Sequence, residues 1–222
     1  FVYSGLVEYL TYNKLTPCIV FCFSRKECEN LLKHIPFSLL DGKEQQETNK
    51  IINHYLRKCD NYESYISMDQ YHRLNHYLQK GLAFHHSGLL PVFKEIVEIL
   101  YSKNLVKVLF ATETFAVGVN MPTKTVIFHS LEKYSGNDFR MLHTHEYLQM
   151  AGRAGRRGID TQGTVILLTN TDYLPAQNQM YNLICGNSQS VRSKFNSDYQ
   201  LILKVISNGT GMHIFNHSLL SN

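Results

Sequence analysis

The chain has 222 residues, of which 44% are hydrophobic and 18% charged, and its formal net charge at pH 7 is +4. This length fits one good-sized domain, or one domain and the beginning of another, with the composition of a globular protein. The mild positive charge is compatible with a nucleic-acid partner but is too small to indicate one alone. No apolar run approaches the ~20 residues that span a bilayer, which argues against a membrane-spanning class.

The cysteines and the first residue indicate the setting of the protein. Five cysteines occur without a C-x-x-C pair. An odd number without framework spacing is typical of a reducing, intracellular compartment, but it does not choose between nucleus and cytoplasm. The chain starts at Phe1 rather than at an initiator methionine and shows no signal peptide, so we expect an intracellular fragment of a longer polypeptide.

The first part of the chain alternates between helical and strand patterns. Residues 5–12 favour a short helix, and the apolar run 18–23 is typical of a strand buried on both faces of a parallel sheet. Ser24, with Glu27 three residues later, predicts an N-cap and a helix over 25–34. Residues 40–70 follow, rich in charged and amide side chains. They predict one or two amphipathic helices that elaborate the surface of the domain.

The second part repeats the alternation. Helices are expected over 71–79, 92–102 and 145–150, and strands over 82–85, 106–111, 124–129 and 163–168. Residues 112–123 are expected to form a loop, and residues 130–143 to be polar and irregular. This alternation predicts an α/β domain of three layers with a mostly parallel sheet.

The pattern turns helical after Pro175, with helices expected over 176–184 and 191–206. We therefore place a domain boundary near residue 180. Residues 1–180 form the α/β domain, and residues 181–222 are expected to be the truncated start of a helical or winged-helix module.

An arginine run at 152–158 carries the clearest chemistry, with three arginines and three glycines in seven residues. Arginine binds phosphate through bidentate hydrogen bonds and keeps its charge at any working pH. Glycine lets the backbone approach a ligand closely. The phosphate could belong to a nucleotide or to a nucleic acid, and the run could also be a solvated turn.

Ligands of a parallel sheet bind beyond the carboxyl ends of its strands. We expect three polar segments at that edge: residues 23–25, residues 112–122 and the arginine run. The arginine run precedes the strand predicted over 163–168, and we expect it to pack on the same edge as the other two segments.

Four ordered motifs then resemble those of superfamily-two helicases. Residues 111–122 resemble motif V, residues 149–156 resemble motif VI, and residues 20–24 look like motif IV. Together with residues 85–91, they resemble the second RecA-like domain, or helicase C-terminal domain, of a superkiller (SKI)-type, exosome-associated DExH-box RNA helicase. The resemblance is continuous over residues 17–170.

Several residues are similar to the exosome-linked branch rather than to the DNA-repair or spliceosomal branches. They are Glu113-Thr114-Phe115, Lys133-Tyr134-x-Gly136 and Phe139-Arg140. More faintly, residues 195–203 look like the entry to the winged-helix region of that family.

The resemblance implies a composite ATP site. Arg153 and Arg156 match the catalytic arginines that neutralise charge on the γ-phosphate, whereas Arg157 lies beyond the matched pair. The resemblance places five residues at the nucleotide: Gln149, Gly118, Asn120, Arg153 and Arg156. ATP and its magnesium would be held by the first RecA-like domain, because this chain has no G-x-x-x-x-G-K-[ST] loop and no Asp-Glu-x-His.

The resemblance also implies RNA contacts that are directed at the backbone and are neutral to sequence. The matching residues are Ser24, Arg25, His86, Ser87, Gly88, Thr112 and Thr114. The family often has glycine where Ser87 stands, and a serine there leaves the backbone amide available. No metal site is expected at His143-Thr144-His145-Glu146, since no further ligands follow at a suitable spacing.

The resemblance therefore predicts the C-terminal motor domain of an ATP-dependent RNA helicase that unwinds 3′ to 5′ in exosome-linked decay. Its partners would be RNA, the first RecA-like domain of the same polypeptide and exosome-cofactor proteins. The isolated fragment is expected to be inactive as an ATPase. The alternatives are a related helicase of the DNA-repair type and a scaffold with a catalytically dead motor.

Overall fold

The structure is a computed structural model, and it describes residues 2–118, 121–168, 175–186 and 207. The chain divides into two compact units, 1–186 and 187–222. Almost all of the second unit lies outside the described residues, as do the helix expected over 191–206 and most of the expected winged-helix module. Helix α9 (Gln177–Cys185) spans position 180 and belongs to the first unit, so the module beyond it stays a prediction.

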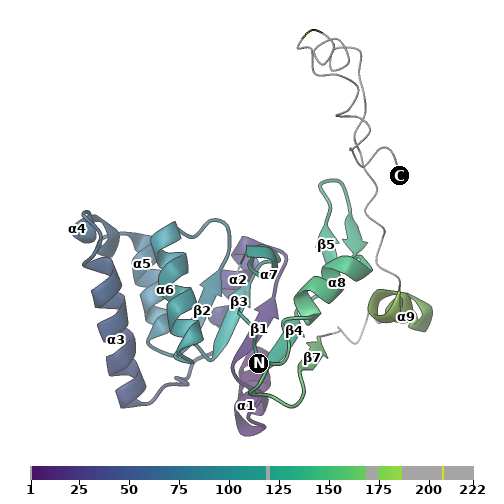
Figure 1. Ribbon diagram of the computed structural model, residues 1–222, viewed down its shortest axis with the longest axis horizontal. Coiled ribbons are helices and arrows are strands. Elements are labelled where there is room, and N and C mark those ends of the chain that lie inside the picture. The colour runs from purple at the N-terminus through teal and green to yellow at the C-terminus, as the bar shows by residue number, and fades with distance from the viewer. Residues whose placement is uncertain (1, 119–120, 169–174, 187–206, 208–222) are drawn as a thin grey trace. The chain divides into compact units, whose positions relative to one another are not determined.

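A five-stranded parallel sheet forms the centre of the first unit, with the strand order β2-β3-β1-β4-β7 (Figure 1). Its strands are β1 (Cys18–Phe21), β2 (Leu82–His85), β3 (Val108–Ala111), β4 (Thr125–Phe128) and β7 (Thr164–Leu167). Every residue of β1 to β4 is buried, as continuous apolar runs require when helices cover both faces. Strand β7 closes one edge and is half-buried.

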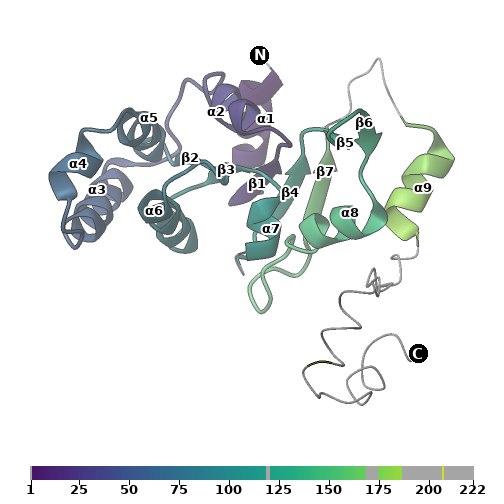
Figure 2. The same cartoon turned by 90° about the horizontal axis from the view of Figure 1, so that it is seen from above.

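Helices lie on both faces of the sheet, as Figure 2 shows from above. Helices α1 (Val2–Tyr12) and α2 (Arg25–Leu32) cover one face, and α6 (Pro91–Ser102), α7 (Thr114–Gly118) and α8 (Thr144–Ala151) the other. The prediction of a three-layer α/β domain with a parallel sheet is therefore confirmed. No helix among the described residues is long and apolar enough to cross a membrane.

The segment 40–70 forms helices beyond strand β2, at one end of the sheet. They are α3 (Gly42–Leu56) and α4 (Tyr62–Ile66), followed by α5 (Asp69–Leu78). Helix α3 buries Ile51, Ile52 and Leu56 and packs on α6. A surface elaboration of the domain is what the amphipathic pattern predicted.

The predicted N-cap of α2 is correct in position, but the side-chain hydrogen bonds expected of it are absent. Ser24 occupies the N-cap position, but its side chain makes no capping hydrogen bond. Glu27 instead pairs with Nε2 of His129 at 2.8 Å, because β4 brings that ring to the end of β1. A complete capping box occurs at α3, between Asp41 and Glu44.

Two segments that were expected to be irregular contain regular elements. Helix α7 forms inside the predicted loop 112–123, and residues 130–143 contain the antiparallel hairpin of β5 (Glu132–Tyr134) and β6 (Phe139–Met141). Elements of three to five residues are shorter than the runs over which a helical or strand periodicity can be recognised in a sequence. Gly136, at φ 103°, forms the turn of the hairpin, so the turn signal was informative although its strands were missed.

Candidate functional site

A cavity of about 200 Å³ opens at the carboxyl ends of the neighbouring strands β1, β2 and β3. It is lined by Phe23, Arg25, Ser87, Thr112, Glu113, Thr114, Lys133 and Tyr134. Four residues predicted to contact RNA, Arg25, Ser87, Thr112 and Thr114, are among them. The fold thus collects side chains that are far apart in sequence into one polar site.

Several polar groups that line this cavity suit a phosphodiester. The hydroxyls of Thr112 and Thr114 lie 2.9 Å apart and hydrogen-bond to each other. The Arg25 guanidinium is exposed, and no hydrogen bond or ion pair engages it within the described part of the chain. An available cation beside hydroxyl groups is the arrangement with which proteins bind a nucleic-acid backbone.

His86 does not fit its predicted role as an RNA-facing side chain. Its ring is buried, pairs with Glu29 at 3.2 Å and stacks on Phe84. Burial lowers its pKa, although Glu29 opposes that effect. Nδ1 of His86 accepts a hydrogen bond from the amide of Gly88, so the ring holds the turn that presents the exposed Ser87 and Gly88.

Ser24 is exposed beside this site but does not line the cavity. Its neighbour Arg25 begins α2, and one Arg25 amino nitrogen would lie 3.4 Å from a Cβ at Gly88. Of the segment 23–25, the two cavity-lining residues are therefore Phe23 and Arg25.

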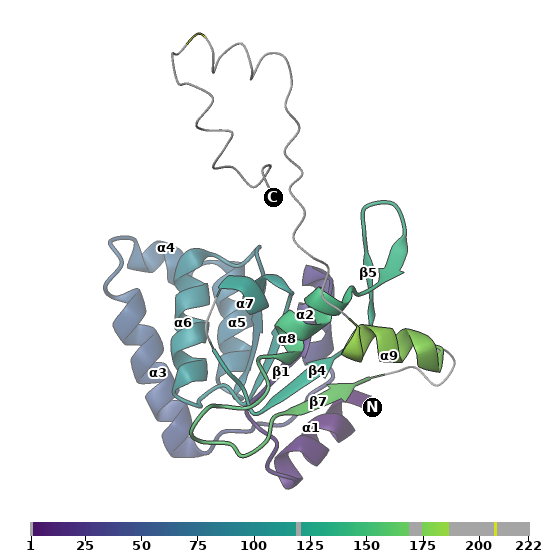
Figure 3. The same cartoon turned by 45° about the vertical axis from the view of Figure 1, so that its right-hand side comes forward.

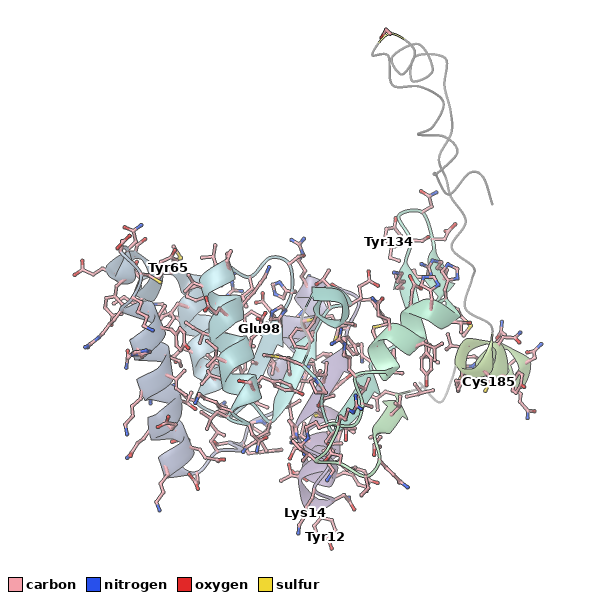
Figure 4. The ribbon with its side chains drawn as sticks, in the orientation of Figure 1. Tyr12, Lys14, Tyr65, Glu98, Tyr134 and Cys185 are labelled. Carbon is pink, nitrogen blue, oxygen red and sulfur yellow. The ribbon has the colours of Figure 1, made fainter. Side chains whose placement is uncertain are left out.

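The hairpin β5–β6 completes the cavity wall through ion pairs. Lys133 lies between Glu113 and Glu146, with its Nζ 2.7 Å from a carboxylate oxygen of each. Burial alone would lower the pKa of Lys133, but these two hydrogen bonds outweigh it and raise the pKa. Figure 4 shows Tyr134 on this hairpin, at the edge of the sheet where α7 begins.

Glu146 is the junction of this network. It accepts two hydrogen bonds from Arg140, each 2.9 Å long, as well as the one from Lys133. Burial would raise the pKa of Glu146, but the two cations hold it far below its usual range. The residues of the resemblance included Glu113, Lys133 and Arg140, but nothing in the sequence paired them.

The arginine run lies at the opposite edge of the sheet. The amide of Thr123 donates to the carbonyl of Arg153 at 2.9 Å, and the amide of Gly155 donates to the carbonyl of Thr123 at 2.7 Å. Thr123 precedes β4, and its hydroxyl donates to the carbonyl of Pro17, which precedes β1. The run therefore sits at the amino ends of the strands, as Figure 3 shows for the loop that leads into β7.

The predicted placement of all three polar segments on one edge is thus wrong. Residues 23–25 and 112–114 follow strands, whereas the arginine run precedes β7. In a parallel sheet a segment before a strand lies at the amino edge, unless it doubles back along the sheet. Helix α8 instead carries the chain from the hairpin at the carboxyl edge down to the arginine run (Figure 3).

Close backbone packing fixes the arginine run. Gly155 has φ 90°, a conformation that favours glycine. A Cβ on Gly163 would lie 2.4 Å from the carbonyl oxygen of Ala154, so the two segments can approach only because that residue is glycine. The arginines consequently extend from a closely packed turn.

Each predicted catalytic arginine has a partner within the domain. Arg156 donates from Nε and Nη2 to the two carboxylate oxygens of Asp160, at 2.7 and 2.9 Å. These hydrogen bonds lower the pKa of Asp160 to about 2. Arg153 donates from Nη2 to the carbonyl of Ala116 in α7.

The remaining nucleotide residues are placed less completely. Gln149 is exposed on α8, one turn before Arg153, and Gly118 ends α7. Asn120 lies outside the described residues. The contact between Arg153 and α7 therefore joins motif VI to the helix that ends at Gly118.

Comparison with known proteins defines the class. Residues 59–158 match the model of the helicase conserved C-terminal domain. The chain is 41% identical over 206 residues to mouse Superkiller complex protein 2. The matched region is 92% of this chain and 16% of the mouse protein. It is 39% identical over 202 residues to yeast Antiviral helicase SKI2, with coverage of 90% and 16%.

A third relative is ATP-dependent RNA helicase mtr4 of Schizosaccharomyces pombe, 39% identical over 204 residues, or 90% of the chain and 18% of that protein. Residues 59–158 of the chain are thus similar to a helicase C-terminal domain. The chain is also similar to the SKI2-like and Mtr4 DExH-box RNA helicases, as the four motifs predicted. It spans about a sixth of the length of these relatives.

Proposed function

We propose that this chain is the C-terminal motor domain of an ATP-dependent RNA helicase, which unwinds 3′ to 5′ and serves exosome-linked RNA decay inside the cell. The observation that carries the proposal is the cavity where Arg25, Ser87, Thr112 and Thr114 meet. These groups bind a phosphodiester backbone without reading bases, as a motor that moves along any sequence requires.

The amino edge supports the second half of the proposal, an ATP site shared with another domain. Nε and Nη2 of Arg156 donate hydrogen bonds to the carboxylate of Asp160. Within the described residues, no hydrogen bond engages Nη1 of Arg156. A guanidinium that is held along one side presents its other side to a phosphate oxygen. Arg153 and Arg156 would supply positive charge to the terminal phosphate of ATP, which the first RecA-like domain holds with magnesium.

The decisive experiment is Arg156→Ala in the full-length protein, with ATP hydrolysis measured at saturating RNA. We expect kcat to fall by about a thousandfold or more, the usual effect of removing an arginine finger. RNA affinity should change less than about twofold, because the cavity lies at the opposite edge of the sheet. The isolated chain should hydrolyse no ATP.

Arg157→Ala is the matched control, because Arg157 is exposed and adjacent to Arg156 but lies outside the matched motif. Its hydrolysis rate should equal that of the wild type. RNA-stimulated hydrolysis at the wild-type rate in Arg156→Ala would refute the arginine assignment. Stronger stimulation by DNA than by RNA would favour the DNA-repair type, and an inactive wild-type protein would favour a scaffold.

A further inference from the structure

Glu113 is a carboxylate in a cavity that is otherwise suited to phosphate. It lines the cavity with Arg25, Ser87, Thr112 and Thr114, and 44% of its side chain is exposed. A negative charge there repels phosphate groups, so the ligand group that Glu113 suits is one that donates a hydrogen bond. Nothing in the contacts of the phosphate-binding residues requires it.

The geometry of Glu113 leaves one acceptor available. Nζ of Lys133 holds Oε2 at 2.7 Å, and Lys133 is itself anchored by Glu146. No hydrogen bond among the described residues engages Oε1. The carboxylate is therefore held by one oxygen, and the other is an available acceptor on a side chain that lines the cavity.

The group along a nucleic-acid backbone that donates a hydrogen bond to such an oxygen is the ribose 2′-hydroxyl. It is present in RNA and absent from DNA, and it is the means by which proteins tell the two apart. A carboxylate that accepts from a ribose hydroxyl is also an established solution in nucleotide-binding folds. Phosphates and bases of a single strand offer no equivalent hydroxyl donor.

We propose that Glu113 reads the 2′-hydroxyl and makes the cavity selective for RNA over DNA. Lys133 is the positioning residue, because it holds the carboxylate in place and offsets part of its repulsion of the backbone. This inference rests on the proposed function, since it requires that the cavity binds a nucleic-acid strand.

The test is binding of the full-length protein to three single strands of one sequence: RNA, DNA and 2′-fluoro RNA. The 2′-fluoro strand keeps an RNA-like sugar but has no donor. We expect Glu113→Ala to reduce the preference for RNA over 2′-fluoro RNA by about tenfold, the value of one hydrogen bond to a charged group. DNA affinity should rise, because a repelling charge is removed.

Two further variants make the result specific. Glu113→Gln keeps the size of the side chain and should reduce the preference by a smaller factor, since a neutral acceptor forms a weaker hydrogen bond. Asp138→Ala removes an exposed carboxylate from the turn of the same hairpin, outside the cavity lining, and should leave the preference unchanged. Thermal melting checks that all three variants are folded.

An unchanged preference in folded Glu113→Ala would overturn the inference. Equal weakening of all three strands would do so as well, because Glu113 would then only anchor the hairpin through Lys133. A wild-type protein that binds no RNA would refute the proposed function itself, which is a different result.

Discussion

The two edges of one parallel sheet are built on different plans, although both carry groups that suit phosphate. At the carboxyl edge, short segments after three strands and one hairpin each contribute one or more side chains to a cavity. At the amino edge, one continuous glycine- and arginine-rich segment is fixed by backbone hydrogen bonds to Thr123. The first site depends on the sheet order, and the second depends on one segment whose backbone is bonded to Thr123 and packs on Gly163.

The contrast shows how one domain can keep a proposed RNA-binding cavity and a proposed ATP-binding segment at opposite edges of its sheet. Two connections join the edges: α7, which runs from Thr114 in the cavity to Ala116 at Arg153, and α8, which runs from Glu146 to the arginine run. Both helices lie side by side on the same face of the sheet (Figure 3). A change in α7 should affect both edges, and a change at one edge should affect that edge alone.

The largest effect is expected from Phe115→Ala in α7. Phe115 is buried, with its ring 4.8 Å from that of His85 at the carboxyl edge and 6.5 Å from that of Tyr101 near the amino edge. Removing a buried aromatic ring should lower the free energy of unfolding by about 3–5 kcal/mol, measured by urea denaturation. Phe139→Ala, at a 73% exposed ring, should cost less than about 0.5 kcal/mol.

Asp160→Asn should damage only the amino edge. Arg156 would keep its charge but lose the paired carboxylate that orients it, so we expect kcat for RNA-stimulated hydrolysis to fall by about tenfold to a hundredfold. RNA affinity should be unchanged. A wild-type kcat in this variant would show that Asp160 does not position Arg156.

The ion pair between Arg156 and Asp160 also makes the stability of the wild type depend on pH in acid, and Asp160→Asn removes this dependence. The folded-state pKa of Asp160 is about 2, below its unfolded value of about 3.9. The stabilisation is therefore present above about pH 4 and is lost as the pH falls toward 2. The difference in melting temperature between the wild type and Asp160→Asn should shrink over that range.

The smallest effect is expected from Arg25→Ala at the carboxyl edge. One exposed phosphate contact is worth up to about fivefold in RNA affinity. Its loss should reduce the slope of log K against log salt by about 0.7. Lys26→Ala removes the next charge on α2, which does not line the cavity, and should leave the slope unchanged. Equal slopes for both variants would show that Arg25 does not contact an RNA phosphate.

The sequence by itself determined the fold class and most of the residues that occur at the two sites. Continuous apolar runs such as 18–23 are typical of strands covered on both faces, and motifs V and VI are local strings that can be read without a fold. Short elements were not predicted, because α7 and the two strands of the β5–β6 hairpin are too short to show a periodic pattern.

Only the tertiary structure decided which residues face each other. It buried His86, paired Lys133 with two carboxylates, and moved the arginine run to the amino edge. The physical reason is that spacing along the chain encodes local periodicity, whereas strand order and helix packing bring distant segments together. The cavity that Glu113 shares with Arg25 and Lys133 is a product of that order, and no local run of residues contains all three.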